Sequence, residues 1–99
     1  MGKSQRDKGA RAEREIVKLL KEKDICAERV PLSGAMHYQG HGHDVTVDKK
    51  LKAEVKIRAN DFARLYSWLE DNDMLFVRRD RDSWLVVMPL DVWLEERNK

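Results

Sequence analysis

Acidic and basic side chains alternate along residues 44–56 at a spacing that could build a hydrolytic site. Lys52, Glu54 and Lys56 recur at every second position, so on a β-strand their side chains leave the same face. Asp44 opens a preceding apolar stretch that should pair with this strand as a hairpin, which can bring its carboxylate near that of Glu54. Two neighbouring carboxylates suit a hard divalent cation, since Mg²⁺ takes one or two protein carboxylates together with waters and phosphate oxygens.

Lys56 would project beside such a cation. An ammonium group there can orient an attacking water, help to deprotonate it, or stabilise charge that develops on a phosphorane. This chemistry is metal-dependent phosphodiester hydrolysis, with Mg²⁺ as the expected cofactor and Mn²⁺ as the alternative. The competing interpretation is an ordinary amphipathic hairpin with a charged outer face, because Glu-x-Lys is common on strands.

A further candidate, Glu13, lies in a helical pattern near the N-terminus. It shares a line with Val17 and Leu20, so it should point along the edge of the apolar stripe, whereas Glu15 should point away. A carboxylate at a core boundary needs a partner, because burying it unpaired is costly. The predicted cation is one such partner, and a salt bridge to a nearby Lys or Arg is the other.

The elements that must position these residues follow from hydropathy and turn signals. Helices are predicted over 9–23, over 62–69 with Asn60 or Asp61 as the cap, and over 92–97 with Asp91 as the cap. Strands are predicted over 25–31, 43–47, 51–57, 74–77 and 84–88, with a charged turn at 48–50. Alternation predicts one apolar face that includes Val45, Val47 and Ile57. The order α-β-β-β-α-β-β-α predicts an α/β fold with a mixed central sheet and flanking helices.

Length and composition favour a single domain over residues 1–99, in which residues 1–8 form a flexible basic segment. Cys26 is the only cysteine, which excludes an intramolecular disulfide and hence a secreted disulfide scaffold. No apolar run approaches about 18 residues, and the N-terminal residues do not resemble a secretory signal. We therefore expect a protein of the reducing cytosol, without a membrane partner.

The net charge of +2 is too small to indicate a nucleic-acid partner by itself, but the basic residues are clustered. Five of them lie between residues 3 and 14, and three more lie between residues 78 and 81. Such clusters are typical of proteins that bind a polyanion, although solvated faces would give the same pattern.

Histidine and tryptophan offer weaker hypotheses. His37, His41 and His43 lie in the glycine-containing loop 33–43 and could bind zinc, with Cys26 as a fourth ligand. Contact with phosphate or water is the favoured interpretation for such loop histidines, and His43 is the one beside Asp44. The three tryptophans could stack on bases, but packing in the core or between subunits is their more frequent use. No phosphate-binding loop motif is present, so no nucleotide cofactor is expected.

The segment 8–20, KGARAEREIVKLL, taken together with Asp44 and the Glu54-x-Lys56 strand, resembles the archaeal-type Holliday junction resolvases of the PD-(D/E)xK nuclease superfamily. The resemblance implies a restriction-endonuclease-like core and a cytoplasmic protein of a prokaryotic cell or a phage-infected host. It also implies an active site built from Glu13, Asp44, Glu54 and Lys56, with the three carboxylates as metal ligands. Ser33, in a Ser-Gly pair like that of the family, is a weaker catalytic candidate.

The implied activity is metal-dependent, structure-selective DNA cleavage that resolves four-way junctions by paired phosphodiester hydrolysis, carried out by a homodimer. Lys8, Arg11 and Arg14 would contact phosphates beside the site, with His43 as a weaker DNA contact. One alternative is a nuclease of the same fold that acts on nicks, flaps or duplex DNA, such as a phage-encoded relative. The other is a DNA-binding module that keeps the fold without turnover.

Overall fold

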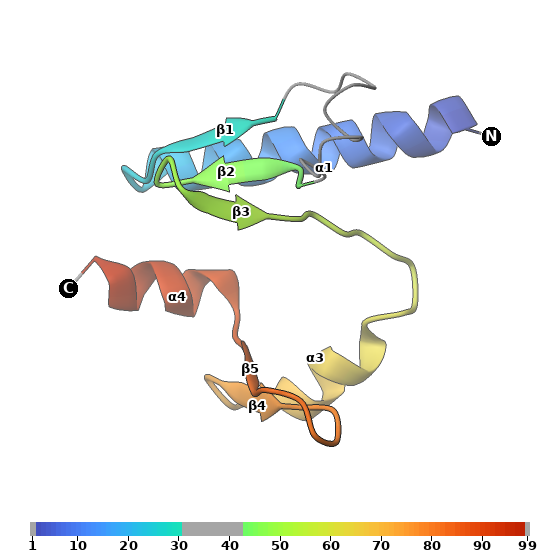
Figure 1. The fold of residues 1–99 in the computed structure, drawn as a ribbon, viewed down its shortest axis with the longest axis vertical. Coiled ribbons are helices and arrows are strands. Elements are labelled where there is room, and N and C mark those ends of the chain that lie inside the picture. The colour runs from blue at the N-terminus through green and yellow to red at the C-terminus, as the bar shows by residue number, and fades with distance from the viewer. Residues whose placement is uncertain (1, 31–42, 99) are drawn as a thin grey trace. The chain divides into compact units, whose positions relative to one another are not determined.

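The structure is a computed structural model that describes residues 2–30 and 43–98, in two compact units, Met1–Ile57 and Arg58–Lys99. The predicted order α-β-β-β-α-β-β-α is confirmed, as is the α/β class (Figure 1). The first unit contains α1 (Gly2–Glu22), β1 (Ala27–Arg29), β2 (Val45–Val47) and β3 (Leu51–Ala53). The second contains α3 (Ala63–Leu69), β4 (Leu75–Val77), β5 (Leu85–Val87) and α4 (Leu90–Arg97).

Helix α1 begins well before Gly9, where the sequence predicted its start, so residues 2–8 of the segment expected to be flexible are helical. Lys, Gln and Arg are good helix formers and the segment contains no proline, so the helix extends through it. At its other end, the chain turns out of the helix at Asp24, whose φ of 62° is left-handed. Here the N–H of Ile25 donates to the carbonyl of Leu20 over 3.0 Å.

The strands of the first unit form one antiparallel sheet in the order β1-β2-β3, and α1 packs against it (Figure 1). Val45 and Val47 of β2 are buried, as their alternation predicted. Ile57 was expected on the same inner face but is exposed, because β3 ends at Ala53 and the residues after it leave the ladder. The core of this unit also includes Leu20, Ile25 and Ala27.

A tight turn at residues 48–50 joins β2 to β3. Asp48 and Lys49 have φ values of 56° and 65°, and the N–H of Lys50 donates to the carbonyl of Val47 over 3.2 Å. Positive φ at both central residues is the feature of a type I′ turn, which suits the twist of antiparallel strands. The N–H of Asp48 also donates to the carbonyl of Cys26, which ties the turn to the start of β1. Cys26 itself is exposed and precedes β1, although the sequence predicted a strand over 25–31.

The two C-terminal helices begin differently from the prediction. The residue that caps α3 is Phe62, and Asn60 contributes only its backbone carbonyl, which accepts the N–H of Ala63 over 3.1 Å. Pro89 precedes α4, so Asp91 lies inside the first turn, where its carboxylate accepts the N–H of Val92 over 3.0 Å. Proline fixes a helix-compatible φ, which explains the earlier start of α4.

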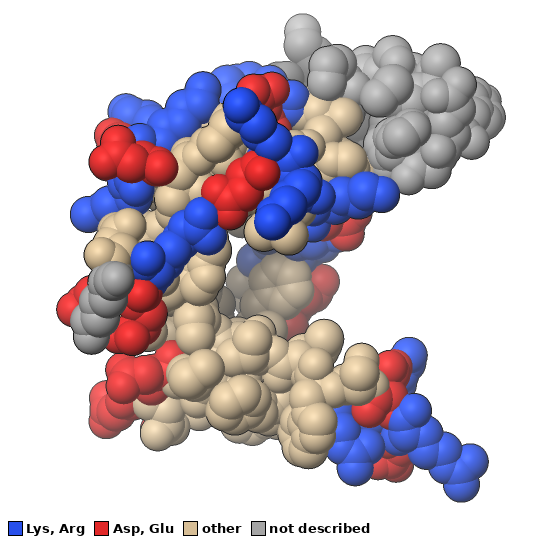
Figure 2. Space-filling model, turned by 60° about the vertical axis from the view of Figure 1, so that its left-hand side comes forward, with Lys and Arg blue, Asp and Glu red and all other residues tan. Residues whose placement is uncertain are grey.

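Strands β4 and β5 form a separate antiparallel pair rather than part of one mixed sheet. β2 and β3 are joined by a short turn, and so are β4 and β5, which suits antiparallel pairing. Two tryptophans of the second unit, Trp68 and Trp84, are more than half exposed. Figure 2 shows a wide uncharged area over this unit, and its exposed large apolar side chains are Tyr66, Trp68, Met74, Phe76, Trp84, Leu85 and Val86.

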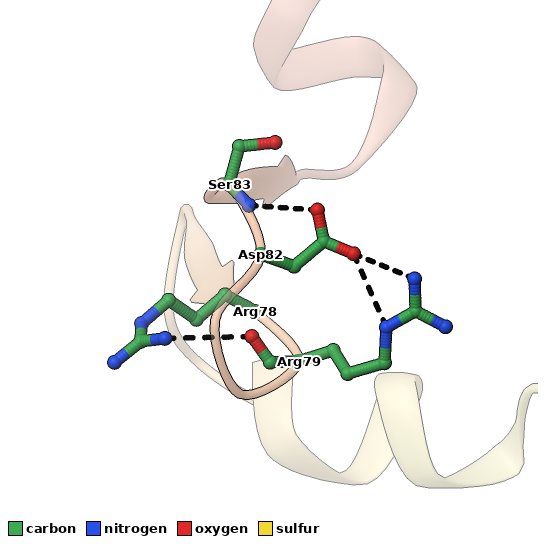
Figure 3. A network of polar contacts seen from close by, with 4 residues as sticks. All are labelled: Arg78, Arg79, Asp82 and Ser83. Carbon is green, nitrogen blue, oxygen red and sulfur yellow. Dashed lines mark hydrogen bonds and ion pairs between the residues drawn. The ribbon is translucent and has the colours of Figure 1, made fainter.

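The loop between β4 and β5 is closed by a polar network (Figure 3). Arg79 donates through Nε and Nη2 to one oxygen of Asp82, over 3.1 and 2.6 Å, and the N–H of Ser83 donates to the other oxygen over 2.9 Å. Arg79, together with this backbone N–H, lowers the pKa of Asp82 below its ordinary value. Arg78 lies over the ring of Trp84, so two arginines of the second basic cluster have structural partners.

No helix in residues 2–30 and 43–98 is long and apolar enough to cross a bilayer.

Candidate active site

Asp44 is fixed at the start of β2 by three hydrogen bonds. Its N–H donates to the carbonyl of Ala53 over 2.9 Å, and its carbonyl accepts the N–H of Val30 over 3.0 Å. Its carboxylate Oδ2 accepts the N–H of Val55 over 2.8 Å. Val45 of β2 also pairs with Ala53, so Asp44 and Val45 both oppose this one residue, as in a β-bulge. Asp44 thereby bonds the backbone on either side of Glu54, through its N–H at Ala53 and through its carboxylate at Val55.

Glu54 and Lys56 follow directly after β3. The Lys56 Nζ lies 3.7 Å from Glu54 Oε2, and both side chains are about half exposed. The hairpin therefore brings Asp44 and the Glu54-x-Lys56 segment together, as the spacing predicted. An ion pair this exposed contributes little to stability, so each partner can exchange the other for a phosphate or a cation at small cost.

A groove of about 330 Å³ borders this segment along one flank of α1. Its α1 wall includes Glu15, which the helical pattern had placed away from the site. The groove therefore combines two carboxylates and one ammonium group with apolar side chains. Its lining residues are Ala12, Glu15, Ile16, Leu19, Glu54, Val55, Lys56 and Ile57.

Glu13 is a buried charged residue of α1, and its partner is Arg29 of β1. Arg29 Nε donates to Glu13 Oε1 over 3.1 Å, and only 11% of the Glu13 side chain is exposed. The sequence left two possible partners for Glu13, a cation or a basic side chain, and the structure contains the salt bridge to a basic side chain. Arg29 was missed in the sequence because nothing local to it signals a partner on α1; the pairing arises from the packing of α1 on β1.

The carboxylates do not converge on one point. Among the described residues, no three His, Cys, Asp or Glu side chains form a group that could hold a metal ion. Asp44, just before β2, and Glu54, just after β3, are nevertheless oxygen donors of the number and kind that Mg²⁺ takes from proteins. His37 and His41 of the zinc hypothesis, and Ser33, lie outside the described residues.

His43 lies next to Asp44 and is half-buried. Its Nε2 lies 3.0 Å from the hydroxyl oxygen of Thr46, and its Nδ1 is buried without a hydrogen-bond partner in the described part of the chain. The imidazole is therefore held at the edge of the site by one side-chain contact.

The three basic residues that were predicted to contact DNA, Lys8, Arg11 and Arg14, are exposed on α1. Figure 2 shows that Lys and Arg side chains gather over the unit that contains α1 and the three-stranded sheet. This unit therefore carries both the carboxylates and an extended positive surface, the combination that a phosphodiester substrate requires.

Comparisons with known proteins bear on this arrangement. Searches of curated proteins and of solved structures found no match. A family model, described as archaeal Holliday junction resolvase (Hjc), matches residues 4–99, which is nearly the whole chain. The matched residues include α1, the hairpin with Asp44 and Glu54, and the entire second unit. The chain is therefore a member of the archaeal Holliday junction resolvase family.

Proposed function

We propose that this protein is a metal-dependent, structure-selective endonuclease that resolves four-way DNA junctions by paired phosphodiester hydrolysis. The observation that carries the proposal is the position of Asp44. Its carboxylate is anchored beside the Glu54-x-Lys56 segment in a chain that belongs to a resolvase family. Family membership supports DNA nuclease activity, and the hairpin geometry supports the metal and the residues named below.

Asp44 and Glu54 would hold the cation, Mg²⁺ or Mn²⁺. Both present carboxylate oxygens, and the bond from Val55 occupies only one oxygen of Asp44. When bound, the cation supplies positive charge that activates water and offsets the charge of the scissile phosphate. Glu13 is our third candidate ligand, and its salt bridge with Arg29 would have to exchange for it to take that role.

The fixed residue of the site, Asp44, and the exposed residue, Lys56, would have different roles. The backbone and the carboxylate of Asp44 are hydrogen-bonded to neighbouring backbone, so this carboxylate is oriented before substrate binds. Lys56 is exposed and weakly paired, so its ammonium group can orient the attacking water and stabilise charge as it develops on phosphorus. Lys8, Arg11 and Arg14 would bind phosphates without reading sequence.

A cleavage panel tests the proposal. Four-way junction, nicked, flap and linear duplex substrates of shared sequence are incubated with the protein, with Mg²⁺ and with a chelator. We expect symmetric cuts in the junction that need Mg²⁺, and much slower cleavage of the other substrates. Equal rates on all four would indicate a nuclease without junction selectivity. Binding without cleavage in Mg²⁺ or Mn²⁺ would indicate a non-catalytic module.

A further inference from the structure

A second groove, of about 480 Å³, runs along the other flank of α1, between this helix and β1. We call it the α1–β1 groove. It is separate from the groove beside Glu54, with which it shares no lining residue. Its lining residues are Arg14, Val17, Lys18, Lys21, Glu22 and Arg29.

The charge of the α1–β1 groove is strongly positive, with four cationic side chains and one carboxylate in its lining. Arg29 is paired with Glu13, so the remaining cations of the groove are Arg14, Lys18 and Lys21. Within the described residues, these three form no ion pair, and all three are exposed. The groove therefore presents positive charge that the protein itself does not neutralise.

The spacing of these cations suits a polyanion with regularly placed charges. Arg14, Lys18 and Lys21 follow one another at i, i+4 and i+7, which places them on one face of α1. At about 1.5 Å per residue, the row is about 10 Å long. That length corresponds to about three nucleotides along one strand of B-DNA, where successive charges are about 3.4 Å apart on the axis.

We propose that the α1–β1 groove binds the phosphate backbone of a duplex DNA arm, with Lys18 and Lys21 extending the contacts of Arg14 away from the cleavage site. The proposal rests on the DNA substrate argued above and adds a second binding surface to it. Two mobile ammonium groups with no carboxylate partner favour a backbone contact over a sequence-specific one, because lysine acts on phosphate as a point charge.

The test is a comparison of two double variants. Lys18→Gln/Lys21→Gln removes two charges from the α1–β1 groove, and Lys49→Gln/Lys50→Gln removes two exposed charges from the β2–β3 turn of the same unit. Junction affinity is measured in chelator over a series of salt concentrations. We expect the groove variant to bind about tenfold more weakly, with a slope of log K against log salt that is smaller by about 1 to 2. The turn variant should match the wild-type protein.

Lysine acetylation footprinting of the wild-type protein gives a second readout that needs no variant to fold. Lys18 and Lys21 should be protected by junction DNA, and Lys49 and Lys50 should not. Equal behaviour of the two variants, or no protection of Lys18 and Lys21 by bound DNA, overturns this inference while leaving the proposed function intact. A wild-type protein that binds no DNA overturns both. Protection of these lysines by an acidic peptide but not by DNA would also overturn it, in favour of a protein partner.

Discussion

Asp44 differs from Glu54 and Lys56 in how firmly it is held. Three hydrogen bonds fix Asp44, whereas the other two side chains are about half exposed and joined by one weak ion pair. In such an arrangement the fixed carboxylate of Asp44 can set the position of a cation, while the exposed side chains of Glu54 and Lys56 adjust to the substrate. The three residues should therefore respond to substitution in distinguishable ways.

Asp44→Asn and Glu54→Gln should each reduce junction cleavage by at least about 100-fold, because each removes an anionic metal ligand. Junction binding should be unchanged or tighter, since each change also removes a charge that repels phosphate. Single-turnover cleavage and equilibrium binding on the same junction measure the two effects. Near wild-type cleavage by either variant would exclude that carboxylate from the site.

Lys56→Ala should reduce turnover by about 100-fold, the usual loss when a positioned proton-transfer or electrostatic group is removed. Lys52→Ala is the matched control, because Lys52 is an exposed lysine of β3, on the same side of the hairpin turn as Lys56. Calorimetry should show that Mg²⁺ affinity changes little in the Lys56 variant. A large loss of Mg²⁺ affinity with normal turnover at saturating metal would contradict the role given to Lys56.

Glu13→Gln and Glu15→Gln separate a metal ligand from a structural salt bridge. Glu13→Gln weakens the pair with Arg29, so the melting temperature should fall, whereas exposed Glu15 should tolerate the change. If Glu13 also binds the cation, its variant should lose cleavage per folded molecule as well as stability. Lost stability with normal cleavage would leave Glu13 as a structural residue. A larger cleavage defect in Glu15→Gln would assign the third carboxylate to the groove beside Glu54.

At the scale of elements, α1 is the component that organises the first unit. Its inner face carries Glu13 and Leu20 onto the sheet, and its two flanks form the two grooves. All of these positions lie between residues 12 and 22 of one continuous helix, which begins at Gly2. The helix also carries a glycine in its interior, at Gly9, which has an energetic cost.

Gly9→Ala should stabilise the protein by about 1 kcal/mol, the difference in helix propensity between the two residues. An added Cβ at this position would meet nothing within 4 Å, so no clash offsets the gain. Thermal or denaturant unfolding measures the change. A destabilised variant would mean that α1 does not extend through Gly9, and weaker junction binding by a stabilised variant would mean that DNA approaches the backbone there.

The elements themselves could be predicted from the sequence because each has a strong local signal. The alternation of Val45 and Val47 identified the inner face of β2, and the charged turn at 48–50 identified the hairpin. The start of α1 could not be predicted, since polar helix formers give no apolar period. The partner of Glu13 could not be predicted either, because it depends on how β1 packs beneath α1.

At the scale of the whole molecule, one chain contains one Asp44–Glu54 hairpin, whereas resolution of a four-way junction needs two cuts at symmetric positions. A two-fold symmetric dimer supplies two sites, and this is the commonest symmetry of soluble oligomers. The second unit has apolar side chains for such an interface, among them Phe76, 62% exposed, and Trp84, 65% exposed. Exposed apolar surface of this kind is typical of protein–protein contacts. We therefore propose a homodimer.

Cleavage of a plasmid that extrudes a cruciform tests paired cutting by such a dimer most directly. With Mg²⁺, the wild-type protein should convert the supercoiled plasmid to linear product, because both strands are cut before the two subunits release the junction. Mixed dimers of wild-type and Glu54→Gln chains should nick one strand and leave open circles. Open circles as the main wild-type product, or equal cleavage of a plasmid without the cruciform, would contradict the account.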